Sequence, residues 1–193
     1  MIIKKINSRL GEKLFFLIVL LYIINTAFTG CKKEDHSEHD IPHDEVGVPY
    51  LPYAVYVADE EDESITVIDP IANVKIGSIM LGDHSNSSLM LIPHNVQVAP
   101  DGKTIWVTGT AHDSGGMEQV IVIDPVANHS IIKRINIGTN QHLAHVVLDS
   151  TSTYAYVTAN ESNEVVKIDA KTYTEVNRFN LNAAHRPHGL RYS

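Results

Sequence analysis

Residues 104–110 read TIWVTGT, and this pattern of an aromatic residue followed by Val returns once before and once after, at a spacing of 50 residues. The flanking copies are YAVYVAD (53–59) and YAYVTAN (154–160). Aromatic and β-branched side chains favour strands that pack on both sides. Self-similarity at such a period predicts a repeat architecture in which each copy is one supersecondary unit.

Each copy is followed by further strand-like stretches in the same order. The second stretches are SITVIDP (64–70), QVIVIDP (119–125) and EVVKIDA (164–170), the third are VKIGSIML (74–81), IIKRINIG (131–138) and TEVNRFNL (174–181), and those between units are HNVQVAP (94–100), AHVVLDS (144–150) and HGLRYS (188–193). Turn residues such as Pro100-Asp101-Gly102 separate them. Four strands per unit predict an all-β chain, a β-propeller of four-stranded antiparallel blades.

The strands amount to about three blades, whereas propellers generally have four to eight. We therefore expect an incomplete ring, which additional blades of a longer chain or self-association of several copies would close. The last stretch, HGLRYS (188–193), offers another solution, because it could pair with the first sheet and complete three blades. An unclosed array leaves an edge strand that is prone to pairing.

Residues 50–193 resemble the YVTN-repeat β-propeller family. The resemblance rests on IPHNVQVAPDGKTIWVTG (92–109), VIVIDPVANHSIIKRINIG (120–138), YVTAN (156–160) and RPHGLRYS (186–193). It implies the propeller fold and, more distantly, a similarity to the propeller domains of nitrous oxide reductase and cytochrome cd1 nitrite reductase. It does not imply one activity, since a fold of this kind supports binding proteins and cofactor-bearing enzymes alike.

The first thirty residues are typical of a lipoprotein signal peptide. Lys4, Lys5, Arg9 and Lys13 precede an apolar core over residues 14–28 that is shorter than a membrane span, and Thr29-Gly30 then lead to Cys31, the only cysteine of the chain. We expect Cys31 to be lipidated after cleavage and to anchor the protein in the outer membrane, on its periplasmic or cell-surface face. Residues 31–48 predict an acidic tether, and blades follow over 49–193.

Charge and motifs exclude some functions. The formal net charge is −8, and the body after the signal peptide is more acidic still, which argues against a nucleic-acid partner. A single cysteine excludes an intramolecular disulfide and a CxxCH haem attachment. There is no GxSxG, P-loop or GxGxxG motif, so no catalytic residue is predicted.

Two sets of tether and strand residues have competing interpretations. His36, His39 and His43 lie among carboxylates in the tether, where they form either a loose metal trap or part of a solvated linker. Three aspartates end the second strand of each unit, namely Asp69, Asp124 and Asp169. We expect them to bond the backbone of the following turn rather than to form an acid–base set. Trp106 and its Tyr counterparts are expected to face the core.

Three histidines stand at or near one repeat position, His94, His145 and His188, each at the start of a strand between units. The family resemblance implies that this strand is innermost and that the imidazoles ring the mouth of the central channel. Neutral imidazoles bind transition metals, so these three are the candidate ligands of a copper ion or a haem-type cofactor. Loop histidines are candidates to supplement them, namely His84, His112, His142 and His185. The alternative is a structural role, in which each imidazole bonds the backbone of the neighbouring blade.

The sequence thus favours a lipid-anchored propeller that binds a ligand or a protein partner through its loops and channel mouth, with its lipid in the membrane. A redox propeller that holds a metal or haem cofactor is the first alternative. An extracytoplasmic lyase or lactonase of the propeller type is the second.

Overall fold

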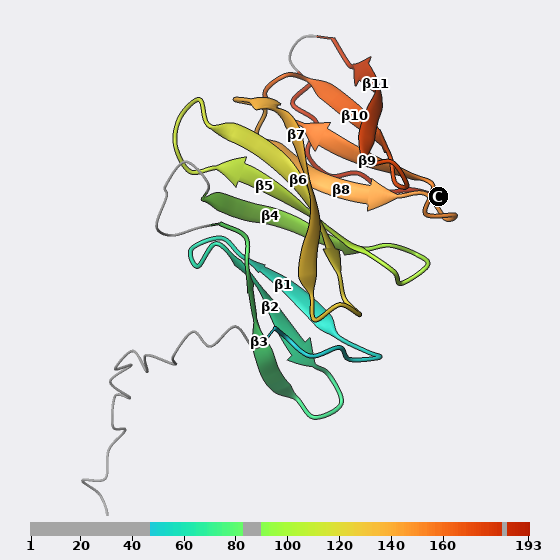
Figure 1. The fold of residues 1–193 in the computed structure, drawn as a ribbon. Helices are drawn as coiled ribbons and strands as arrows, with labels where there is room; N and C mark the ends of the chain where they lie inside the picture. Colours follow the sequence, from blue (N-terminus) through green and yellow to red (C-terminus); the bar gives the residue numbers. More distant parts are fainter. Residues whose placement is uncertain (1–46, 83–89, 183–184) are drawn as a thin grey trace, which may run out of the picture. The chain divides into compact units, whose positions relative to one another are not determined.

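Three antiparallel β-sheets make up the part of the chain that the computed structural model describes, residues 47–82, 90–182 and 185–193 (Figure 1). The first sheet contains β1 (Val55–Asp59), β2 (Ser64–Asp69) and β3 (Val74–Met80). The second contains β4 (Leu91–Val98), β5 (Ile105–Ala111), β6 (Met117–Asp124) and β7 (Ser130–Thr139). The third contains β8 (Leu143–Leu148), β9 (Tyr154–Ala159), β10 (Glu164–Asp169) and β11 (Thr174–Asn180). No helix in these three ranges could cross a bilayer.

The sheets are the blades of a partial β-propeller, which confirms the predicted fold class. Strand order follows the sequence in every sheet, and neighbouring strands run antiparallel. The inner strand β4 contacts both β1 and β8, so the three blades meet along their inner edges. Eleven of the twelve expected strands are present in the described ranges.

The prediction of a strand at residues 188–193 is wrong. Residues 185–193 form no strand, and the first sheet remains three-stranded. The reason lies in the pairing rule of this fold, because β4 and β8 each pair with the strand that follows them in the sequence. Residues 185–193 pair with no strand of the described ranges, and their backbone instead accepts hydrogen bonds from side chains of β9 and the adjoining turn.

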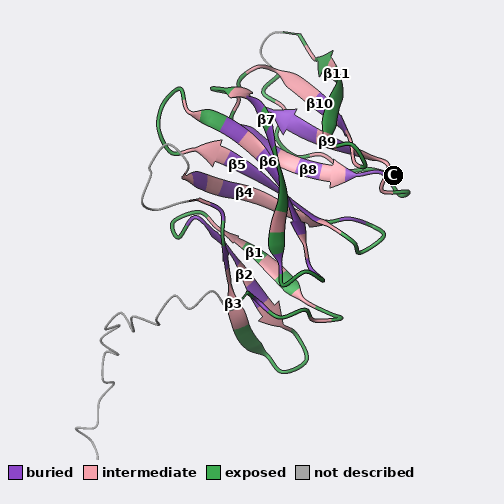
Figure 2. Ribbon diagram, in the orientation of Figure 1, coloured by how far each residue is buried: buried purple, intermediate pink, exposed green. Residues whose placement is uncertain are grey.

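Buried residues follow one another along β5 and β6 of the second blade, so both faces of these two strands are covered (Figure 2). On β5, Ile105 and Val107 pack toward the first blade with Ile65 and Val67, whereas Trp106 packs toward the third blade in a separate cluster. Trp106 is fully buried, as expected, and donates from Nε1 to the Thr104 hydroxyl at 2.9 Å. Burial on both faces explains why the strands read as nearly continuous apolar runs.

The first blade leaves its outward face uncovered. Val55 and Val57 are 46% and 37% exposed, although they occupy the repeat positions of the fully buried Ile105 and Val107. The face that packs on the second blade is closed by Val48, which is buried and whose carbonyl accepts a hydrogen bond from His129 Nδ1 at 2.8 Å. The chain is therefore part of the folded body from at least Val48 onward.

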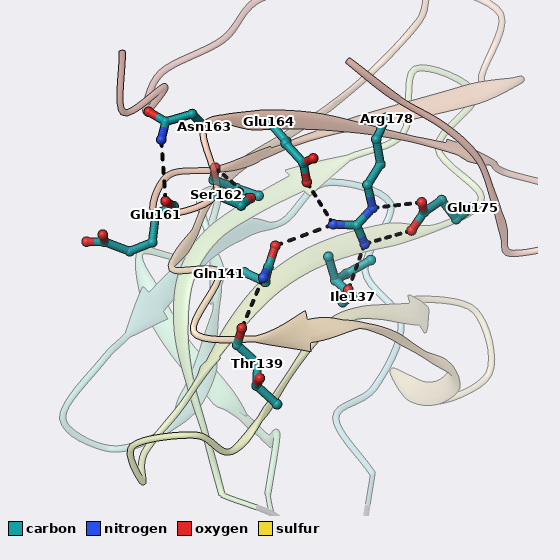
Figure 3. Close-up of polar contacts among 10 residues, drawn as sticks. Ile137, Thr139, Gln141, Glu161, Ser162, Asn163, Glu164, Glu175 and Arg178 are labelled. Carbon is teal, nitrogen blue, oxygen red and sulfur yellow. Dashed lines mark hydrogen bonds and ion pairs between the residues drawn. The ribbon is translucent and has the colours of Figure 1, made fainter. Parts of the chain in front are cut away.

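Arginines on the outermost strands connect successive blades. Arg178 of β11 donates from Nη2 to the Ile137 carbonyl of β7 at 2.7 Å and forms ion pairs with Glu164 and Glu175 (Figure 3). Arg134, at the same register position of β7, donates to the Leu81 carbonyl after β3 at 2.6 Å. These contacts fix the outer edges of the blades.

The repeat aspartates act as turn residues, as predicted. Each accepts two backbone N–H groups through Oδ1, from residues two and three positions later along the chain. The donors are Ile71 and Ala72 for Asp69, Val126 and Ala127 for Asp124, and Lys171 and Thr172 for Asp169.

The predicted signal peptide, Cys31 and the tether histidines lie outside the described residues, as does His84.

Candidate functional site

Two of the three repeat histidines lie in β-bulges at the inner edge of their blades. The ladder between β4 and β5 passes from the pair Pro93–Gly109 directly to Asn95–Thr108, so His94 has no partner. Between β8 and β9 it passes from Leu143–Ala159 to Val146–Val157, which leaves His145 in the irregular stretch. A bulge interrupts the alternation of a strand and redirects its side chain. His94 and His145 are therefore released from the pattern that buries their neighbours.

Side chains from neighbouring strands satisfy the backbone groups that the β8 bulge leaves unpaired. An unpaired backbone group that is shielded from water costs about as much as a lost hydrogen bond, so these contacts stabilise the bulge. The pairs are Thr108 Oγ1 to the Ala144 carbonyl at 2.9 Å, the His145 N–H to Thr158 Oγ1 at 2.9 Å, and the Val146 N–H to Asn95 Oδ1 at 3.0 Å. Two of the three come from the second blade, so the position of His145 is set across the blade boundary.

His188 is held beside β9 although it lies in no strand. Thr158 Oγ1 donates to the His188 carbonyl at 2.7 Å, the same role that Thr108 has toward Ala144 one blade earlier. The Asn160 side-chain amide donates to the carbonyls of Arg186 and Pro187 at 3.1 and 3.3 Å. The buried hydroxyl of Thr158 thus connects the backbone of His145 to that of His188.

A fourth histidine, His142, is positioned by a buried carboxylate. Glu118, only 5% exposed, accepts the N–H groups of Gln141 and His142 through Oε1 at 2.8 and 2.9 Å, and that of Leu143 through Oε2 at 2.9 Å. Three bonds to one carboxylate fix the connection that enters β8. No role for Glu118 was predicted from the sequence. Glu63 and Asn163 occupy the same repeat position in the other two blades, and this recurrence of a side chain with an acceptor oxygen was a signal for its role.

The four rings form one cluster. The ring centres of His94 and His188 are 5.1 Å apart, and those of His145 and His188 are also 5.1 Å apart. His94 lies 6.2 Å from His145 and 5.7 Å from His142. The structure therefore brings together the three predicted histidines and one of the four supplementary ones. His94 and His145 are half-buried, and His142 and His188 are exposed, so the cluster is open to solvent on one side.

Two observations describe the electrostatics of the cluster. The Nδ1 atom of His94 is buried and has no hydrogen-bond partner among the described residues. Burial lowers the pKa of His145 below its ordinary value, and the adjacent rings of His188 and His94 lower it further, because a second positive charge in this place is repelled. The neutral form of the His145 imidazole is therefore favoured.

The other described histidines have different surroundings. The His112 ring lies 3.5 Å from the Asp113 carboxylate, and both side chains are exposed. The His185 N–H donates to Asn163 Oδ1 at 3.1 Å. His129 is buried and satisfied, since its Nε2 lies 2.9 Å from the Tyr56 hydroxyl and its Nδ1 bonds Val48. The His129 ring therefore has a structural role, which was not predicted from the sequence.

Comparisons with known proteins show the fold. No protein-family model and no curated protein matches the sequence. Among solved structures, the chain is similar to hydrazine synthase of Kuenenia stuttgartiensis, with a TM-score of 0.56, 18% identity, and coverage of 84% of this chain and 42% of that one. It is similar to virginiamycin B lyase from Staphylococcus aureus (TM-score 0.52, 14% identity, 74% and 44% covered) and to the WD40 repeats of RRP9 (0.50, 14%, 65% and 34%). The chain thus spans less than half the length of these solved chains.

Proposed function

We propose that this protein is a YVTN-type propeller, lipid-anchored in the cell envelope through Cys31, that binds its ligand at the histidine cluster on the inner edge of the blades. The observation that carries the proposal is the convergence of His94, His142, His145 and His188 on one solvent-open place. Polar side chains that converge on the inner edge of a rigid scaffold are typical of a binding site.

The chemistry of the cluster favours binding over catalysis. Its side chains are imidazoles, and the carboxylates nearest to a repeat pattern, Asp69, Asp124 and Asp169, are engaged in turns. Glu118 is likewise occupied by three backbone donors. An imidazole can itself act as a general acid or base, but the carboxylates named here are already engaged and do not supply a partner that would orient it or share its proton.

The envelope location is supported by the sequence alone. The ending Phe28-Thr29-Gly30-Cys31 resembles a bacterial lipobox, and an acidic tether separates it from the blades. Two arms test this part. Metabolic labelling with a palmitate analogue should mark the wild type and not Cys31→Ala, and the variant should leave the membrane fraction. Labelling of both proteins, or of neither, would refute lipidation at Cys31.

Native mass spectrometry tests the binding site. The protein is released from the envelope in mild detergent, and its mass is compared with that of the variant His94→Ala/His145→Ala/His188→Ala. We expect a bound species on the wild type that the variant lacks. An adduct of equal occupancy on both proteins would place the ligand elsewhere, and a wild type that carries no adduct under conditions that preserve known complexes would refute the function.

A further inference from the structure

We infer that the histidine cluster coordinates a divalent transition-metal ion through His94, His145 and His188, with His142 as a fourth ligand. The inference rests on the proposed function and deepens it, because it names the chemical class of the ligand. Imidazole nitrogen is a preferred donor for Cu²⁺, Ni²⁺ and Zn²⁺, and the cluster supplies no thiolate. For such a donor set, the affinity order places Cu²⁺ first.

The spacing of the rings fits one shared ion. With metal–nitrogen distances of about 2.0–2.1 Å, each ring centre lies about 3.2 Å from the ion. Two rings on one ion are then about 4.5 Å apart at a right angle, about 5.2 Å apart at the tetrahedral angle and about 6.4 Å apart when they are opposite. The separations among His94, His145 and His188, 5.1, 5.1 and 6.2 Å, all fall in this range, as does the 5.7 Å between His94 and His142. Packed rings also lie about 4.5–7 Å apart, so the spacing is compatible with a shared ion, and the unpaired nitrogen of His94 is the observation that favours one.

The orientation of the rings is what binding would change. Across residues 47–82, 90–182 and 185–193, no three His, Cys, Asp or Glu side chains direct their donor atoms at a common point as they stand. The rings of His94 and His188 instead meet edge to face, as do those of His145 and His188. Rotation about the side-chain bonds redirects the nitrogens while the backbones stay fixed. This requires no change in the bulges.

His94 supplies the second observation. Its buried Nδ1 has no hydrogen-bond partner in the described part of the chain, and a buried polar atom in a native structure is nearly always paired. Coordination of an ion through Nδ1 of the His94 ring removes this deficit. A purely structural histidine looks different, as His129 shows with both ring nitrogens bonded.

The cluster is also held in place before an ion binds. The backbones that carry the ligands are fixed in advance by Thr108, Thr158 and Glu118, which limits the ordering that binding requires.

Copper titration of the full-length, chelator-stripped protein in detergent tests the inference. Isothermal titration calorimetry gives stoichiometry and affinity, and electron paramagnetic resonance of the Cu²⁺ complex reports the equatorial nitrogen donors. We expect one tight site with at least three nitrogen donors. In His94→Ala/His145→Ala/His188→Ala that site should weaken by more than the roughly 10- to 100-fold typical of outer-shell changes.

The matched control is His36→Ala/His39→Ala/His43→Ala, which removes the same number of imidazoles from the tether and should keep the tight site. Circular dichroism melts show whether each variant is folded, and the nitrogen count in the wild type does not depend on any variant. Fewer than three nitrogen donors, or a tight site that only the tether variant loses, would overturn the inference. An organic or protein adduct in the native mass spectrum, without copper binding at the cluster, would overturn it while leaving the proposed function intact.

Discussion

Glu118→Gln is the most informative single change in the described part of the chain, because it keeps the shape of the side chain and removes only its charge and one acceptor. Both carboxylate oxygens of Glu118 are in use, with Oε1 bonded to the N–H groups of Gln141 and His142, and Oε2 to that of Leu143. A glutamine keeps one acceptor oxygen and replaces the other with an amide that can only donate.

The third blade shows what an amide can do at this position. Asn163 precedes β10 at the repeat position of Glu118, and its single Oδ1 accepts two N–H groups, those of His185 at 3.1 Å and Arg186 at 2.8 Å. The glutamine introduced by Glu118→Gln should therefore retain two bonds and oppose its amide to the buried Leu143 N–H. Hydrogen bonds to a charged group contribute about 1.5–3 kcal/mol, and a buried donor left unpaired adds to the loss. We expect the free energy of unfolding to fall by about 2–4 kcal/mol.

Urea denaturation followed by circular dichroism measures this loss, and at the slope typical of small domains the midpoint should fall by roughly 1–2 M. Glu61→Gln is the control, since Glu61 is exposed in the turn between β1 and β2. A Glu118→Gln midpoint that coincides with that of the control would refute the argument that this carboxylate fixes the connection into β8.

Three further predictions concern the core, pH and the outer strands. Trp106 fills the contact between the second and third blades, so Trp106→Ala should lower the free energy of unfolding in urea by about 3–5 kcal/mol, and Trp106→Phe should lower it by less. Equal losses in the two variants would contradict this reasoning. Folding lowers the pKa of His145, so the unfolded chain takes up a proton at this residue before the folded protein does, and the folded state loses stability as pH falls below about 6.5. The urea midpoint should therefore fall between pH 7.5 and pH 5, and it should fall less in His145→Gln. Parallel pH profiles of the two proteins would refute the assignment to His145. Arg178→Lys should cost about 1–2 kcal/mol in the same assay, because an ammonium cannot bond Ile137, Glu164 and Glu175 at once, whereas Arg191→Lys should cost nothing measurable.

The strands and the core could be predicted from the sequence because they follow from periodicity. An aromatic–Val pair at a fixed spacing locates the strand next to the innermost one, and burial of both faces follows when side chains at odd and even positions are all apolar, as in Trp106 and Val107. The turn role of Asp124 was equally predictable, since a short carboxylate at a strand end bonds the next backbone N–H groups.

The exact site could not be predicted, because it depends on irregularities. A β-bulge is an extra residue in one strand of a hydrogen-bonded pair, and the residue types around His94 and His145 do not predict where it occurs. The position of His142 depends on the connection before β8, whose backbone is held by Glu118 from a different strand. The failure at residues 188–193 has a related cause, since strand propensity forms no strand without a paired neighbour.

The location of the histidines relative to the repeat is the strongest argument that the cluster serves a function. Thr108 and Thr158 occupy the same repeat position. Thr108 donates to the Ala144 carbonyl and Thr158 to the His188 carbonyl, so Ala144 is the repeat counterpart of His188. Had the histidines belonged to the architecture of the blade, this alanine would be a histidine. Instead His145 stands one residue later, in a bulge that side chains from another blade stabilise, and still reaches the same cluster. A departure from the repeat that still brings the His145 ring to the same cluster is expected at a functional site.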